Sequence, residues 1–171
     1  YYKEFGTTLS GLMKNHNVDS DHFLEYVHKV NLEKLTESRD LVNSLSQLPG
    51  KKIIYTNGDS KHAENVLNKL NIKNLFDDIF DIKKSSLIPK PNKESLERLI
   101  KFHDLNPRKT VYFEDIEINL KNAYDFGITT FLIGYNKRGL KNSYVNYSFN
   151  TILSALNFLK KGSFQEIQVH Y

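Results

Sequence analysis

Short apolar runs alternate with amphipathic helical patterns along most of the chain, and this alternation limits the possible folds more than any other feature. Strands that alternate with helices predict an α/β fold with a doubly wound, mostly parallel sheet. Four runs suit buried strands and a fifth suits a short edge strand; these are residues 52–56, 79–82, 110–113, 129–133 and 145–149.

The expected helices carry start and stop signals. Asp59 and Asn92 each precede an apolar stripe at helical spacing and are typical N-cap residues. Residues 1–30 predict two helices, the second capped by Ser20 and reaching Val30. Further helices are predicted around residues 41–48, 120–127 and 151–161.

Composition narrows the class of protein. The 171 residues suit one domain, or one domain with a small appendage, and 39% hydrophobic with 26% charged residues is ordinary for a globular protein. The net charge of +4 is spread along the chain, so we expect no nucleic-acid partner, and no apolar run suits a membrane span. The chain has no cysteine, which excludes disulfides and favours a reducing cytoplasm. We expect a monomer or a homodimer.

Polar residues cluster where predicted strands end. In doubly wound sheets, ligands bind outside the carboxyl ends of the strands. One polar group follows the strand at residues 52–56, a second follows the strand at residues 110–113, and a lysine lies between two prolines. The residues at these positions are Thr56, Asn57, Gly58, Lys90, Glu114 and Asp115.

The first group and the lysine suit a phosphate ester. Thr56 offers a hydroxyl donor, and the backbone N–H groups of Asn57 and Gly58 can form an anion-binding nest at a helix start. Lys90 supplies a positive charge on a backbone restricted by its neighbouring prolines. The alternatives that remain open are a plain N-cap for Thr56 and a surface lysine for Lys90.

The second group suits a metal. Glu114 and Asp115 offer hard oxygen ligands, and Mg²⁺ prefers one or two carboxylates together with waters and phosphate. The same pair could instead be the polar first turn of a helix, where acidic side chains are favoured by the helix dipole. The three features fall at successive strand–helix units, and this combination favours a phosphate site.

The order of these features resembles the second, third and fourth signatures of the haloacid dehalogenase superfamily. These are an apolar run ending in TNG, a lysine flanked by prolines, and an apolar run ending in Glu-Asp with Asn119 four residues further on. The stretches YYKEFGTTLSGL, FLEYVH and KKIIYTNGDSKHAENVLNKL are similar to the pyrimidine 5′-nucleotidase branch. The resemblance extends from Tyr1 to about Leu159.

The resemblance implies a Rossmann-like core with a small helical cap: residues 1–35 would form part of the cap, and residues 36–171 the core without its first strand. It implies an aspartate nucleophile, a second aspartate as general acid and base, and Mg²⁺. By position, Thr56 and Lys90 would bind substrate and act in catalysis, helped by Asn57 and Gly58. Asp115 would be catalytic and bind the metal.

Beside these residues, the resemblance makes Glu114 a second metal ligand or a supporting residue, with Asn119 in support. One departure from the family is serious, because no Asp-x-Asp follows an apolar strand anywhere in this chain. We expect that signature upstream of Tyr1, on a strand that lies between the strands at residues 52–56 and 110–113. Those two strands should then not be hydrogen-bonded to each other.

These observations predict a Mg²⁺-dependent phosphatase of small phosphorylated metabolites, with nucleoside 5′-monophosphates as the expected substrates. The alternative is a non-catalytic member that keeps the fold and binds phosphate or a protein. His16, His28 and His62 share no metal-ligand spacing, so we expect surface or packing roles for them. A substrate-facing role for His28 stays open, because it lies in the FLEYVH stretch.

Overall fold

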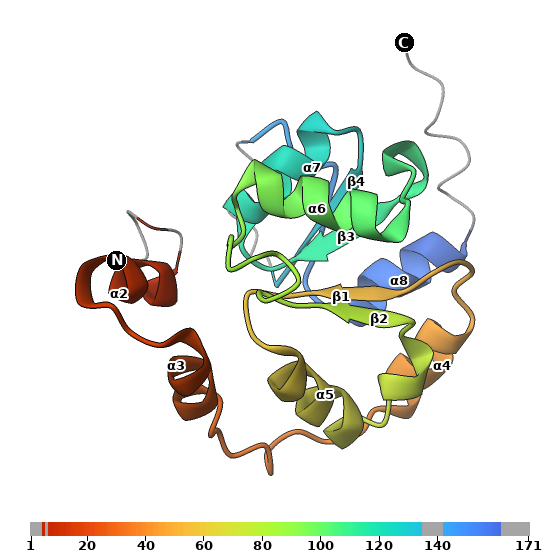
Figure 1. Ribbon diagram of the computed structural model, residues 1–171. Coiled ribbons are helices and arrows are strands. Elements are labelled where there is room, and N and C mark those ends of the chain that lie inside the picture. Colours follow the sequence, from red (N-terminus) through yellow and green to blue (C-terminus); the bar gives the residue numbers. More distant parts are fainter. Residues whose placement is uncertain (1–4, 6, 135–141, 162–171) are drawn as a thin grey trace. The chain divides into compact units, whose positions relative to one another are not determined.

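The computed structural model describes residues 5, 7–134 and 142–161, which form an α/β protein with parallel sheets (Figure 1). The chain divides into two compact units. The first unit comprises Tyr1–Glu37 and Lys51–Leu105, and the second comprises Ser38–Gly50 and Asn106–Tyr171. The predicted cap at residues 1–35 and core at residues 36–171 remain predictions. Parts of both, including the start of YYKEFGTTLSGL, lie outside the described residues.

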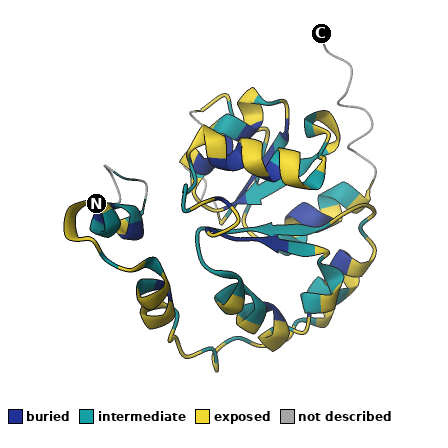
Figure 2. Cartoon of the chain, viewed as in Figure 1, coloured by how far each residue is buried: buried dark blue, intermediate teal, exposed yellow. Residues whose placement is uncertain are grey.

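The first unit contains a two-stranded parallel sheet whose strands run side by side (Figure 1). Ile54 lies opposite Ile79, and the neighbouring Phe80 is completely buried. Helix α6 has buried and exposed positions (Figure 2), as expected of an amphipathic helix. The elements are α2 (Thr8–His16), α3 (Ser20–Val27), β1 (Ile53–Tyr55), α5 (Ser60–Lys69), the 3₁₀ turn η1 (Lys73–Leu75), β2 (Asp78–Phe80) and α6 (Lys93–His103).

Helix starts in the first unit follow local side-chain chemistry. Asp59 caps α5 by accepting from His62 N at 2.8 Å, and Asn92 caps α6, which confirms both predictions. The prediction for α3 was wrong by one residue, because the carboxylate of Asp19 rather than Ser20 caps that helix. This helix ends at Val27, and Val30 is 51% exposed beyond it.

Strand β2 covers residues 78–80, whereas the sequence predicted residues 79–82. The difference arises at Asp81, whose buried carboxylate accepts from Ser60 N and Lys84 N, each at 2.9 Å. A buried carboxylate is costly without such donors. The backbone therefore leaves the strand at Asp81, where these two N–H groups can reach the carboxylate. After the turn, Ile82 packs with Leu9 and Leu24 of α2 and α3.

The second unit contains a three-stranded parallel sheet in the order β3-β4-β5, with Phe131 opposite Tyr147. Strand β4 has the predicted bounds. The helix expected around residues 120–127 is a 3₁₀ turn followed by a short α-helix. The elements are α4 (Arg39–Ser46), η2 (Pro107–Lys109), β3 (Val111–Glu114), η3 (Glu117–Leu120), α7 (Lys121–Asp125), β4 (Thr129–Ile133), β5 (Tyr147–Phe149) and α8 (Ile152–Lys160).

An aromatic cluster centred on the fully buried Phe131 forms the core of the second unit. Full burial of a ring of this size contributes about 1.5–3 kcal/mol. The four rings around Phe131 have centroids 5.0 to 6.2 Å from it and belong to Phe113, Tyr147, Phe149 and Phe158. Helix α8 supplies Phe158 and packs on α4.

In the described part of the chain, strand β1 pairs with β2 and strand β3 pairs with β4, and the two sheets share no strand. This is the pairing that a further strand between β1 and β3 requires. The existence of that strand stays a prediction. Across residues 5, 7–134 and 142–161, each helix is too short or too polar to cross a lipid bilayer.

Candidate active site

The loop after β1 is a tight turn organised by Thr56. Its Oγ1 accepts a hydrogen bond from Gly58 N at 2.9 Å. The Gly58 N–H, which we expected to face an anion, is therefore used inside the turn. A hydroxyl that accepts through its oxygen keeps its own hydrogen, so Thr56 remains able to donate to a ligand.

Asn57 joins this loop to the distant lysine. Its Oδ1 accepts from Lys90 N at 2.8 Å, and its Nδ2 donates to Lys90 O at 3.2 Å, although the two residues are 33 positions apart. The Lys90 ammonium donates to Tyr55 O at 3.1 Å and lies 5.0 Å from the centre of the Tyr55 ring. The four predicted phosphate-binding residues thus lie together in the first unit.

A chain of hydroxyl groups starts at Tyr55, the residue that Lys90 contacts, and the sequence analysis did not identify it. The Tyr55 hydroxyl lies 2.5 Å from Ser95 Oγ, which lies 2.7 Å from the hydroxyl of Ser85. The Ser85 hydroxyl also donates to Ile88 O at 2.6 Å. The hydroxyl of a tyrosine on a buried strand usually has a hydrogen-bond partner. The tyrosine at the end of this strand was therefore the sequence feature that could have indicated the hydroxyl chain.

The acid loop after β3 lies in the second unit and is organised by Glu114. This side chain is 7% exposed. Its Oε2 accepts from the Tyr112 hydroxyl at 2.7 Å, and its Oε1 accepts from the backbone N–H groups of Asp115 and Ile116, both at 3.2 Å. Each oxygen therefore already has a donor. Asp115 is exposed and presents its carboxylate at the surface of this unit.

The donor atoms near the acid loop fit Mg²⁺ by chemistry. Asn119 is buried, and its Oδ1 has no hydrogen-bond partner among the residues that the structure describes. Such an amide oxygen, like the carboxylate of Asp115, is a hard donor of the kind that Mg²⁺ prefers. Within the described ranges, no group of three or more His, Cys, Asp or Glu side chains is arranged so that it could hold a metal ion. Mg²⁺ needs only one or two carboxylates when waters and phosphate complete its shell.

His28 lies beside the loop after β1, a position that the sequence analysis left open. Its Nδ1 is 3.1 Å from Asp59 Oδ1, and its ring stacks on His62 with centroids 4.3 Å apart. Burial lowers the pKa of His28, the Asp59 carboxylate opposes this shift, and His62 adds to it. The neutral imidazole is therefore favoured at neutral pH.

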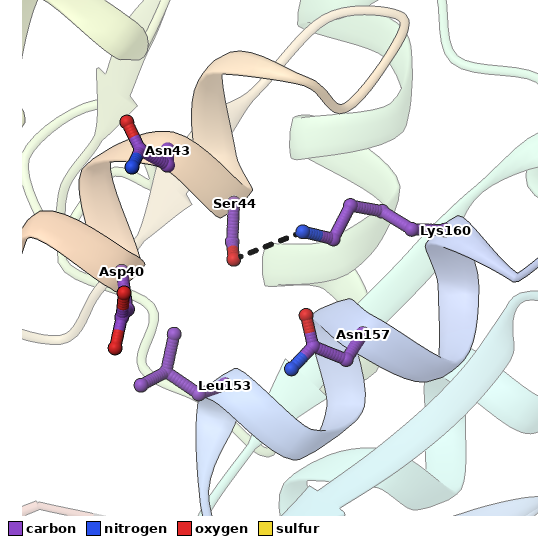
Figure 3. A pocket seen from close by; sticks show the side chains of 6 residues that line it. All are labelled: Asp40, Asn43, Ser44, Leu153, Asn157 and Lys160. Carbon is purple, nitrogen blue, oxygen red and sulfur yellow. Dashed lines mark hydrogen bonds between the residues drawn. The ribbon is translucent and has the colours of Figure 1, made fainter.

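A small polar cleft lies elsewhere, between α4 and α8 of the second unit (Figure 3). The Lys160 ammonium donates to Ser44 Oγ at 3.2 Å and to Gln47 Oε1 at 3.4 Å, so it joins the two helices. We assign no ligand to this cleft. Its volume is about 230 Å³, and its lining residues are Asp40, Asn43, Ser44, Leu153, Asn157 and Lys160.

Solved structures share this fold. An L-2-haloacid dehalogenase from Xanthobacter autotrophicus aligns with a TM-score of 0.63 at 15% identity, over 75% of this chain and 62% of that one. A phosphatase from Thermococcus onnurineus gives 0.61 at 21% identity, over 85% and 66%. A magnesium-bound hydrolase from Bacillus subtilis, described as putative, gives 0.59 at 21% identity, over 70% and 53%.

The chain thus spans between 53 and 66% of the length of these three structures. Identities this low show a shared fold alone. The family itself is shown by sequence, because the profile of the haloacid dehalogenase-like hydrolases matches residues 3–133. The chain belongs to the haloacid dehalogenase-like hydrolases.

Proposed function

We propose that this chain carries the phosphate-binding and metal-binding residues of a Mg²⁺-dependent phosphomonoester hydrolase. The observation that carries the proposal is the pair of hydrogen bonds from Asn57 to the Lys90 backbone. These bonds hold a lysine and the Thr56 hydroxyl in one loop cluster, where a phosphoryl group needs both a cation and a donor.

In this proposal, Thr56 and Lys90 act on the phosphoryl oxygens. The Thr56 hydroxyl donates to one oxygen while its own oxygen still accepts from Gly58 N. Lys90 offsets the negative charge that phosphate and a nucleophilic carboxylate bring together. Its ammonium donates a hydrogen bond to Tyr55 O, which holds the charge in place before the reaction. A charge placed in advance stabilises the transition state without reorganisation.

Asp115 is the proposed metal ligand of the acid loop, because it is exposed whereas both oxygens of Glu114 have donors. Glu114 then holds the loop in shape through Tyr112 and the backbone. Bound Mg²⁺ would polarise a phosphoryl oxygen and neutralise its charge. Asn119 supports the same loop from its buried position.

The chemistry also needs an aspartate nucleophile, which we place on a strand upstream of Tyr1. A carboxylate oxygen of that aspartate bonds to phosphorus while the ester O–P bond breaks, and the leaving oxygen takes a proton from a neighbouring acid. Water then attacks the aspartyl phosphate. This step releases phosphate, restores the carboxylate and returns the proton to the acid.

The proposed substrates are small phosphorylated metabolites, and among them nucleoside 5′-monophosphates. The resemblance of the TNG and FLEYVH stretches to the pyrimidine 5′-nucleotidase branch supports this choice. A phosphatase and a magnesium-bound hydrolase among the structures of similar fold are compatible with it. We propose a cytoplasmic location, from the lack of cysteine, and a monomer or a homodimer.

The test is phosphate release by the full-length protein, with and without 5 mM Mg²⁺. The panel comprises UMP, CMP, AMP and p-nitrophenyl phosphate, with chloride release from L-2-chloropropionate measured in parallel. We expect Mg²⁺-dependent turnover of the phosphomonoesters, fastest with the pyrimidine nucleotides.

Turnover of the chloro acid alone would instead make the protein a dehalogenase. Binding of UMP without turnover, in protein that contains the upstream aspartate, would favour the non-catalytic alternative. A control with Lys93→Ala, an exposed lysine paired with Glu97 on α6, should match the parent protein.

A further inference from the structure

Three side chains that the proposed reaction does not use gather beside the loop after β1. His28 follows α3, whereas Asp59 and His62 lie at the start of α5. The two imidazole rings are stacked with 10° between their planes. The side chains of His28 and Asp59 are 19% and 14% exposed, so the cluster is largely buried yet reachable from solvent.

One edge of the His28 ring faces the proposed phosphate loop. A methyl group on Gly58 would lie 3.3 Å from His28 Nε2 and 3.4 Å from Thr56 Oγ1. The imidazole nitrogen and the threonine hydroxyl therefore border the same small space over the glycine. Glycine at this position leaves that space open, whereas a larger residue would fill it.

The opposite edge of the ring faces a carboxylate. His28 Nδ1 lies 3.1 Å from Asp59 Oδ1, a close contact that is not a well-formed hydrogen bond among the described residues. A buried polar atom without a well-formed hydrogen bond destabilises the folded state. Protonation of the ring would turn this contact into an ion pair with Asp59.

We propose that His28 binds the phosphoryl group of the substrate as an imidazolium, with Asp59 against Nδ1 and Nε2–H directed to a phosphoryl oxygen. The inference rests on the proposed function, because it uses the same loop. One proton enters the ring from solvent as the dianion binds, and it leaves when phosphate departs. The site then selects phosphomonoester dianions over diesters and neutral esters.

The charges near His28 support a link between protonation of its ring and binding of the phosphoryl dianion. Asp59 and His62 act on the ring from the start of α5, and Lys83, which interacts electrostatically with Asp59, pairs with Asp21 of α3 at 2.6 Å. Without ligand, burial lowers the pKa of the imidazole and so favours its neutral form. A dianion beside Nε2 would add a second negative charge to that of Asp59, and an opposite charge within about 4–6 Å raises the pKa of a histidine.

The experiment measures proton uptake when sulfate binds to the full-length protein. Sulfate stays a dianion from pH 5 to pH 9, so any proton taken up belongs to the protein. Calorimetry at pH 7 in two buffers of different ionisation enthalpy should give a net proton uptake when sulfate binds. His28→Gln should abolish the uptake and weaken sulfate binding at pH 6 at least ~5-fold. At pH 8.5 the same variant should bind within about twofold of the parent.

His22→Gln is the matched control, because His22 is exposed on α3, the helix that His28 follows, and it should behave as the parent protein. A packing role for His28 predicts equal weakening at both pH values with the uptake retained, and that result overturns the inference. Loss of uptake in His62→Gln but not in His28→Gln also overturns it. If His28→Gln does not fold, NMR titration of the parent decides, because sulfate must raise the pKa of His28.

Thr56→Val separates the two proposals. Suppose that sulfate binds more weakly to Thr56→Val but that the parent takes up no proton. The role of His28 is then wrong, and the proposed phosphate site is still supported. If the parent does not bind sulfate, or binds it no more tightly than Thr56→Val does, both the proposed phosphate site and the role of His28 are wrong.

Discussion

The loops after β1 and β3 both end a parallel strand in a polar turn, but they are held in different ways. Asn57 fixes the first loop through two hydrogen bonds to a residue 33 positions away. Glu114 fixes the second loop through Tyr112, Asp115 and Ile116, all within two positions. The first loop therefore depends on tertiary packing, whereas the hydrogen bonds of Glu114 in the second loop are local.

This difference assigns separate tasks to the two units. A hydrogen bond contributes about 0.5–1.5 kcal/mol net, so the two bonds from Asn57 represent on the order of 1–3 kcal/mol that favour one placement of Lys90. In the acid loop, the hydrogen bonds of Glu114 next to Asp115 come from residues within two positions. Substitutions in the first loop should therefore change both stability and activity, whereas substitution of Asp115 should change activity alone.

The largest effect should come from Asp115→Asn in the full-length protein. Loss of the proposed metal ligand should lower Mg²⁺-dependent turnover of p-nitrophenyl phosphate at least ~10³-fold. The thermal unfolding midpoint should stay within about 2 °C, because the side chain is exposed. Asp125→Asn on α7, which breaks an exposed pair with Lys121, should leave turnover unchanged. Unchanged turnover in Asp115→Asn would remove the metal-ligand assignment.

Lys90→Ala should follow, with turnover lowered at least ~10²-fold because a charge aimed at the phosphoryl group is lost. Lys90→Arg should not restore full activity, since the guanidinium is larger and planar. Steady-state kinetics with p-nitrophenyl phosphate measure both variants against the parent protein. Activity within about threefold of the parent in Lys90→Ala contradicts the assigned role.

Asn57→Ala and Tyr112→Phe together test the contrast in how the loops are held. Asn57→Ala removes both bonds to Lys90, so kcat/KM should fall about 10-fold and stability by about 1–3 kcal/mol. Tyr112→Phe removes only the hydroxyl that donates to Glu114, and it should cost about 1 kcal/mol and less than about threefold in kcat/KM. Urea denaturation and steady-state kinetics measure both. Equal effects of the two substitutions would contradict the contrast.

The smallest effect concerns pH, and only its direction follows from the structure. Burial lowers the pKa of His28 and of His103, both in the first unit, whereas the described part of the second unit contains no histidine. Because each folded pKa lies below the unfolded value, the unfolded state binds protons first as pH falls, and stability is lost on the acid side of about pH 6.5.

Hydrogen exchange at pH 7.5 and pH 5.5, corrected for intrinsic rates, measures this difference between the units. Protection of α5 and α6 should fall more than protection of β3 and β4. His103→Gln should reduce the loss in α6. Equal losses in the two units would show that these histidines do not set the acid sensitivity.

Local sequence signals predicted much of the fold because their physics is local. Asp59 and Asn92 cap their helices through donors two or three residues away, and the apolar run of β4 needs no partner to be identified. The positions of Thr56 and Asp115 at strand ends follow from the same patterns. Composition and motif order were sufficient to indicate the family.

Only the tertiary structure decided the contacts that join distant segments. Asp81 ends β2 early because its buried carboxylate needs Ser60 N, 21 positions away. The bonds from Asn57 to Lys90 and the approach of His28 to Gly58 likewise join residues about 30 or more positions apart. Caps and periodicity act over a few residues, whereas these contacts depend on how helices and strands pack, which no local pattern encodes.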